Sequence, residues 1–178
     1  MNALHGKLVR LRAPEPEDIE YLFKWENNTE IWHLSNTLTP FSRYTLKQYI
    51  ESSTADIYEA KQVRFMIDLQ SENNKTIGTI DLFEFDPYNC RVGIGILIAD
   101  TAYRGRGFAG DALETIIRYV FDVLMLHQVF CNIAADNESS IALFKSKGFS
   151  IIGEKKDWIK TFNGWVGEYS LQLINRNK

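Results

Sequence analysis

Apolar and polar residues follow two different rhythms along the chain, and each rhythm predicts a different element. Strict alternation, as in KLVRLRA at residues 7–13, is typical of a strand buried on one face. Apolar residues spaced three and four apart, as in the segment 109–125, are typical of a helix with one buried face. The patterns predict strands over 7–13, 62–70, 76–86, 91–99, 128–135, 150–160 and 165–174, and helices from residue 16, over 46–60, over 109–125 and between 136 and 148.

Turn residues fix how these elements connect. Asn163-Gly164 is a hairpin signal between the last two strands, and the segments SENNK and PYNC separate three consecutive strands. The resulting order is β-α-α-β-β-β-α-β-α-β-β, without an internal repeat or linker. We therefore expect one α/β domain over residues 1–178, with a mixed, mostly antiparallel sheet flanked by helices.

Composition and charge exclude several classes of protein. The chain has 178 residues, 45% of them hydrophobic, and a net charge of −3, so no basic excess indicates a nucleic-acid partner. Residues 1–89 carry 14 acidic and 9 basic residues, and residues 90–178 carry 9 acidic and 11 basic residues. This asymmetry suits a cationic substrate on one side and a phosphate ligand on the other, although ordinary surface scatter would also produce it.

The few cysteine and histidine residues predict neither a disulfide framework nor a metal site. Two cysteines and three histidines are scattered along the chain without C-x-x-C or H-E-x-x-H spacing. No signal peptide and no apolar run of membrane-spanning length is visible. We therefore expect a cytoplasmic protein without a metal and without a membrane partner.

The segment YRGRGFAGDAL, residues 103–113, contains a G-x-G-x-x-G pattern between an apolar run and a helix. This pattern occurs in dinucleotide-binding turns, which also require parallel strands joined by helices. Here antiparallel hairpins come before the loop, so NAD binding is the weaker interpretation. Glycines, the positive end of a helix and the charges of Arg104 and Arg106 still favour binding of a phosphate.

Two separate segments resemble the GCN5-related N-acetyltransferases (GNAT). RGRGFA matches the family's Gln/Arg-x-x-Gly-x-Gly/Ala signature, and NESSIALFKSKGF is similar to its Asn-x-x-Ser/Ala segment that ends in Gly-Phe. The opening LVRLRAPEPEDIEYL resembles the branch that holds ribosomal-protein N-terminal acetyltransferases and bacterial spermidine acetyltransferases. The resemblance implies a GNAT fold, in which a splayed pair of strands forms the acetyl-CoA site.

This resemblance also implies which residues bind acetyl-CoA. Backbone groups of the strand before the glycine loop would bind the pantetheine arm, and the amides of the loop would hold the pyrophosphate. The segment after the next strand would contact the far side of the arm. The residues concerned are Ile96, Leu97 and Ile98; Arg104, Gly105, Arg106, Gly107, Phe108, Ala109 and Gly110; and Asn137, Ser140 and Phe144.

The reaction implied is acetyl transfer from a thioester to a primary amine. An amine with a pKa of about 10.4 must lose a proton before it attacks, and a carboxylate can take that proton directly or through water. The expected base is Glu84, which would face away from Asp81 if their strand is regular. An amide near Leu97 would stabilise the oxyanion. Glu30, Trp32 and His33 are candidates for binding the acceptor, together with Glu84, and Glu26 lies in the same region.

Phe144 stands where many family members have a tyrosine that protonates the leaving thiolate. Phenylalanine cannot donate a proton, so a non-catalytic acyl-CoA-binding module remains an alternative to an enzyme. For the enzyme, the acceptor is a polyamine such as spermidine or spermine, or alternatively a protein N-terminus. The acidic N-terminal half favours the small cationic amine. The C-terminal strands offer an edge on which a second copy could pair, so the oligomeric state stays open.

Overall fold

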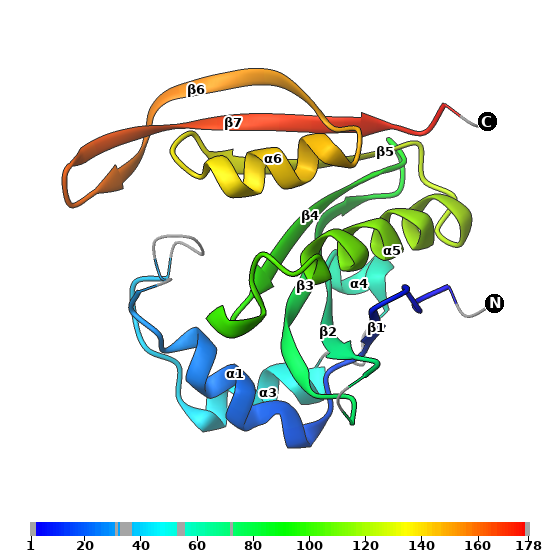
Figure 1. The fold of residues 1–178 in the computed structure, drawn as a ribbon, viewed down its shortest axis with the longest axis vertical. Coiled ribbons are helices and arrows are strands. Elements are labelled where there is room, and N and C mark those ends of the chain that lie inside the picture. Colours follow the sequence, from blue (N-terminus) through cyan, green and yellow to red (C-terminus); the bar gives the residue numbers. More distant parts are fainter. Residues whose placement is uncertain (1–2, 31, 33–36, 53–55, 72, 177–178) are drawn as a thin grey trace.

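Seven strands form one sheet in the order β1-β2-β3-β4-β5-β7-β6 in a computed structural model of the protein (Figure 1). The structure describes residues 3–30, 32, 37–52, 56–71 and 73–176. The strands are β1 (Val9–Arg12), β2 (Val63–Leu69), β3 (Thr76–Asp86), β4 (Arg91–Ile98), β5 (Gln128–Ala134), β6 (Ser150–Thr161) and β7 (Gly164–Ile174). The helices are η1 (Pro16–Asp18), α1 (Ile19–Glu26), α3 (Arg43–Ser52), α4 (Ile57–Ala60), η2 (Thr101–Tyr103), α5 (Phe108–Asp122) and α6 (Glu138–Ser146).

The sheet opens between β4 and β5, the one parallel pair among the named strands. These two strands pair only over Arg91–Gly93 and Gln128–Phe130. Beyond that point β4 continues to Ile98 beside β3, and β5 continues to Ala134 beside β7. The two halves of the sheet therefore diverge, as Figure 1 shows, and the predicted splayed pair of strands is confirmed.

Helices cover the two faces of the sheet in different places. The apolar stripe of α5 is buried, with Ala112, Leu113, Ile116 and Val120 fully covered, and it packs with the main core of the sheet. On the opposite face α1 and α3 enclose a second cluster, in which Leu22 and Leu46 pack with Met66 of β2. The predicted helix 109–125 is confirmed within a few residues at its C-terminal end.

The predicted single helix over 46–60 is wrong. Helix α3 ends at Ser52, and α4 begins at Ile57 after residues 53–55, which lie outside the described part of the chain. The Asp56 carboxylate accepts hydrogen bonds from the N–H groups of Tyr58 and Glu59. This side chain starts a new helix by satisfying the N–H groups of its first turn.

One carboxylate joins the N-terminal segment to α5. Asp111 accepts hydrogen bonds from the backbone N–H groups of Lys7, Leu8 and Val9 at 2.7–3.0 Å. A Cβ at Gly6 would lie 2.3 Å from Asp111 Oδ2, so only glycine allows this close approach. The segment before β1 is thereby fixed next to the first turn of α5. None of the helices in the described segments is long and apolar enough to cross a membrane.

Candidate active site

The edge of β4 that faces away from β3 is paired with β5 only up to Gly93, so its backbone is open from Ile94 to Ile98. Ala99 N–H donates to Ile77 O at 3.0 Å, and the register with β3 is regular from Gly93 to Ile98. In an antiparallel ladder this alternation directs the N–H and C=O of Leu97 toward β3 and those of Ile96 and Ile98 away from it. The carbonyl of Ile98 accepts from Arg104 Nε at 2.8 Å, which agrees with that direction.

This alternation corrects one predicted contact. Ile96 and Ile98 can offer backbone groups to a ligand between β4 and β5, whereas the backbone of Leu97 is used within the sheet. The side chain of Leu97 is half-buried. An oxyanion donor on this strand is therefore expected at Ile96 rather than at Leu97.

The glycine loop and the start of α5 form a cradle for an anion. Gly105 and Gly107 have positive φ angles of 70° and 87°, and Gly107 is the N-cap residue just before α5. The N–H groups of Phe108, Ala109 and Gly110 belong to a first helical turn, where the helix itself provides no acceptor. These free amides and the positive end of the helix suit a pyrophosphate.

The two arginines of the loop differ in what they contact. Arg104 is directed back to the Ile98 carbonyl and braces the loop against β4. Arg106 is exposed, and its guanidinium lies 5.4 Å from the ring centre of Tyr103 and 5.3 Å from that of Phe108. Arg106 is thus the arginine whose charge is available beside the cradle. The loop follows η2 and antiparallel strands, so the NAD interpretation fails on the fold.

Helix α6 contributes the segment predicted to contact the far side of the ligand. Asn137 caps the helix by accepting the N–H of Ser140 at 3.2 Å. Phe144 is only 3% exposed and meets the ring of Phe149 edge to face, with ring centres 5.0 Å apart. Phe144 therefore has a packing role, and little ring surface remains for its predicted contact with acetyl-CoA.

Glu84 lies at an irregular point of β3. The register shifts between Phe83 and Asp86, and Glu84 has a φ of 50°. Without this bulge its side chain would follow Ile80 and Leu82 into the core, because alternate residues share a face. The predicted orientation of Glu84 away from Asp81 depended on a regular strand. The bulge breaks that regularity and leaves Glu84 exposed.

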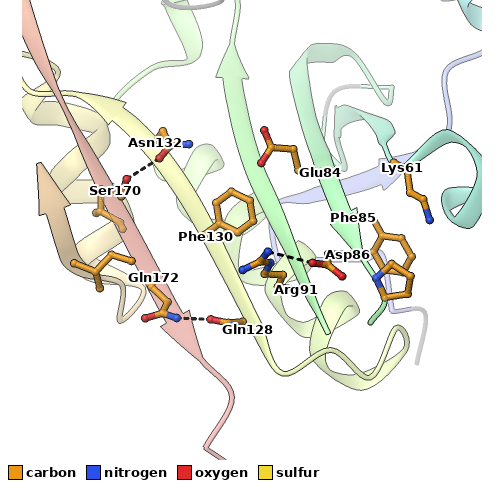
Figure 2. Close-up of a pocket in the computed structure, with 13 residues that line it drawn as sticks. Lys61, Glu84, Phe85, Asp86, Arg91, Gln128, Phe130, Asn132, Ser170 and Gln172 are labelled. Atoms are coloured by element: carbon orange, nitrogen blue, oxygen red, sulfur yellow. Dashed lines mark hydrogen bonds and ion pairs between the residues drawn. The ribbon is translucent and has the colours of Figure 1, made fainter. Parts of the chain in front are cut away.

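A hollow of about 720 Å³ lies beside Glu84 (Figure 2). Phe130 and Asn132 of β5 line it and alternate with the buried Val129, Cys131 and Ile133. The hollow therefore lies on the face of β5 that points away from the main core. Its other polar lining residues are Lys61, Asp86, Arg91, Gln128, Ser170 and Gln172.

An ion-pair network that the sequence patterns did not predict lies on the same face as Met66. Arg64 of β2 donates to Asp81 at 2.7 and 3.2 Å and to Glu26 at 2.6 Å. Burial is the largest single effect and works against the charge of Arg64. Attraction to Asp81, the hydrogen bonds to Asp81 and the charge of Glu26 together outweigh it and raise the pKa of the guanidinium. The network carries one net negative charge, and Asp81 is level with Gly95 of β4.

The other residues predicted to bind the acceptor are Trp32, Glu30 and His33, and of those that the structure describes only Trp32 contacts the Arg64 network. Trp32 is half-buried, and its Nε1 donates to the Glu26 carbonyl at 2.7 Å, which puts Trp32 beside the network. Glu30 is exposed in the turn between α1 and Trp32. His33 lies outside the described residues. Among the residues that the structure describes, no group of three or more metal-binding side chains is present.

The open edge of β4 leads to the anion cradle at the start of α5. The polar hollow beside Glu84 lies on the opposite face of the sheet. This arrangement suits an enzyme that binds a phosphate-bearing donor on one side of the sheet and a second substrate on the other. The family model described as "Acetyltransferase (GNAT) domain" matches residues 9–150. The chain belongs to the GNAT acetyltransferase family, and it is an N-acetyltransferase that uses acetyl-CoA.

Individual relatives agree with this family. An uncharacterized N-acetyltransferase, p20 of Bacillus licheniformis, is 28% identical over 177 residues, 99% of this chain and 98% of the relative. Spermidine N(1)-acetyltransferase of Escherichia coli is 27% identical over 153 residues, 82% of this chain and 75% of the relative. The crystal structure of spermidine N-acetyltransferase from Vibrio cholerae with CoA and spermine has a TM-score of 0.83 at 20% identity, covering 94% of this chain and 95% of that one.

Proposed function

We propose that this N-acetyltransferase acetylates a primary amine of a small polycation, a polyamine such as spermidine or spermine. The observation that carries the proposal is the negative charge on the face with the Arg64 network. The two negative charges of Glu26 and Asp81 outnumber the single positive charge of Arg64. Glu84 makes no ion pair within the described part of the chain. The spermidine N(1)-acetyltransferase of Escherichia coli supports the same acceptor class.

The proposed roles on the donor side follow from the free backbone groups. Ile96 and Ile98 would pair with the pantetheine arm, and the amides of the glycine loop through Gly110 would hold the pyrophosphate. Acetyl-CoA supplies the activated acetyl group. The Ile96 N–H would stabilise the charge that develops on the acetyl oxygen.

The proposed base is Glu84, which takes the proton of the acceptor through a chain of water molecules. The pairs on either side of the bulge are Phe83 with Gly93 and Asp86 with Arg91. Glu84 therefore lies near the level of Val92, which at about 3.3 Å per residue is about 13 Å along β4 from Ile96. Because that separation is too long for a direct transfer or for a transfer through one water, the proposed path is a chain of several water molecules from the amine to Glu84.

Glu26 lies nearer to Ile96, because Arg64 joins it to Asp81, which is level with Gly95. Glu26 would bind the ammonium group of the acceptor rather than take its proton.

A protein N-terminus is the second candidate acceptor. Side-chain amides and a hydroxyl line the hollow beside Glu84, namely Gln128, Asn132, Gln172 and Ser170. Such groups pair with the backbone of a peptide.

The test measures thiol release from acetyl-CoA with spermidine, spermine, a monoamine and N-terminal peptides. We expect Glu84→Gln to lower kcat for every acceptor by about 10²-fold or more, as loss of a general base does. We expect Glu26→Gln to raise KM for the polyamines and to leave KM for acetyl-CoA unchanged.

Glu20→Gln is the matched control, because Glu20 lies on the same helix as Glu26 and pairs with the exposed Arg43. Turnover with peptides alone would replace the polyamine proposal by the second candidate. Tight acetyl-CoA binding without turnover of any of these acceptors would contradict both.

A further inference from the structure

Lys147 lies at the C-terminal end of α6, on the side of that helix that faces α5. Positions 140, 143, 144 and 147 share one side of a helix because they are three and four residues apart. Ser140 and Leu143 are half-buried, and the Lys147 side chain is 24% exposed, although lysine is mostly found exposed. The ammonium group of Lys147 is therefore held against the protein.

The stem of Lys147 crosses the first turn of α5 at Gly110. A Cβ at Gly110 would lie 3.7 Å from Lys147 Cε, 4.0 Å from Lys147 Nζ and 3.8 Å from Leu143 Cδ1. Gly110 is the third residue of α5, so the ammonium lies beside the turn whose N–H groups form the cradle. The absence of a side chain at Gly110 keeps this space open.

Glu114 holds the ammonium in place one turn further along α5. Lys147 Nζ donates to Glu114 Oε2 at 2.7 Å, and this hydrogen bond and charge lower the pKa of Glu114. The charge of Lys7 also lowers it, and the carboxylate of Asp111 acts in the opposite direction. Asp111 is engaged by three backbone N–H groups, so its charge is partly compensated.

We propose that Lys147 is a phosphate-binding residue of the acetyl-CoA site, reaching from α6 to the cradle of α5. The proposal rests on the proposed function of the glycine loop as the pyrophosphate site. CoA carries phosphate in its pyrophosphate and on the 3′ position of its ribose, and an ammonium group binds either. A charge-assisted bond of this kind is stronger than one between neutral groups.

The experiment measures the Kd of CoA and of 3′-dephospho-CoA by isothermal titration calorimetry. We expect Lys147→Met, which keeps the stem and removes the charge, to weaken CoA binding by about tenfold or more. Equal weakening for both ligands assigns Lys147 to the pyrophosphate. Weakening for CoA alone assigns it to the 3′-phosphate. Both results support the proposal, and Lys147→Arg should restore most of the affinity.

Two control variants separate the effect of the Lys147 charge on CoA binding from the effects of another lysine charge and of the ion pair with Glu114. Lys145→Met removes an exposed lysine of the same helix, and Glu114→Gln breaks the same ion pair while the ammonium remains. The proposal is overturned if Lys147→Met binds CoA as wild type does, or if Glu114→Gln weakens CoA binding as much as Lys147→Met does.

The pyrophosphate role of the loop is tested separately by Gly107→Asp. Unchanged CoA binding in that variant would refute the loop assignment itself. A loss there with wild-type binding in Lys147→Met would refute only the role of Lys147.

Discussion

Single residues determine how the site is fixed within the fold, and Asp111 is one of them. Its two carboxylate oxygens hold three consecutive N–H groups from a segment more than one hundred positions earlier in the chain. Leu8, in that segment, lies within 3.8 Å of a Cβ position at Gly107. The N-terminal segment therefore forms part of the surroundings of the phosphate cradle.

Replacing Asp111 by alanine should lower the free energy of unfolding by about 2 kcal/mol, because three N–H groups lose a charged acceptor. Urea denaturation followed by circular dichroism measures the change. Asp122→Ala, at an exposed position on the same helix, should change stability by less than about 0.5 kcal/mol. Equal stability of the two variants would show that the Asp111 bonds contribute nothing.

The direction of three neighbouring amides in β4 can be measured one residue at a time. Without ligand, the Leu97 N–H should exchange slowly with solvent because β3 accepts it, while those of Ile96 and Ile98 should exchange faster. Acetyl-CoA should slow exchange at Ile96 and Ile98 and leave Leu97 unchanged. Amide exchange measured by NMR tests this, and ligand protection centred on Leu97 would contradict the corrected assignment.

At the scale of the elements, close contacts between backbones set the shape of the donor strand. Gly78 of β3 lies against β4, where a Cβ would come within 2.0 Å of Leu97 O and 3.0 Å of Ile98 Cα. Gly93 leaves room for the ring of Phe83, which a Cβ at this position would meet at 2.4–2.7 Å. A side-chain ring thus lies over β4 at Gly93.

Gly78→Ala should push Leu97 and Ile98 away from β3, because the carbonyl that blocks the new methyl group belongs to the backbone. We expect a loss of about 1–3 kcal/mol of stability, typical of overpacking, and weaker acetyl-CoA binding. Thermal unfolding and calorimetry measure both quantities. Gly153→Ala is the control, since nothing lies within 4 Å of its Cβ position. A Gly78→Ala variant as stable as this control would contradict the close approach.

The elements also show what sequence patterns can and cannot predict. The periodicity of residues 109–125 and the Asn-Gly turn at 163–164 predicted α5 and the last hairpin correctly, because burial of one face and turn chemistry are local properties. The bulge at Glu84 has no local signal, because a positive φ there is held by the pairing of β3 with β4. The Arg64 network joins three distant segments, so spacing along the chain could not predict it.

At the scale of the whole molecule, the two halves of the sheet are joined through few residue pairs. Strands β4 and β5 share three pairs, and α5 and α6 complete the connection on one face. The core nevertheless runs through both halves, with Ile94 of β4 and Cys131 of β5 in one cluster. The chain should therefore unfold as one unit.

The two cysteines allow a measurement of whether both halves of the sheet unfold together. Cys90 is exposed, whereas Cys131 is 2% exposed and burial raises the pKa of its thiol to about 12. Because the thiolate is the reactive form, a thiol reagent at pH 8 should label Cys90 alone in the native protein. Mass spectrometry should find Cys131 labelled along the same denaturant curve as circular dichroism. Labelling of Cys131 well before global unfolding would show that the β5 half opens separately.

The two edges of the sheet bear on how the protein behaves at high concentration. An exposed strand edge invites pairing with another chain and so promotes aggregation. Here β1, at one edge, has four residues, and β6, at the other, has register shifts between Ile151 and Gly153 and between Lys155 and Ile159. Lys155, Lys156 and Lys160 add charge along β6. Short length, irregular register and lysines make both edges poor templates for amyloid-like growth, so the open sheet that admits a ligand does not carry that hazard.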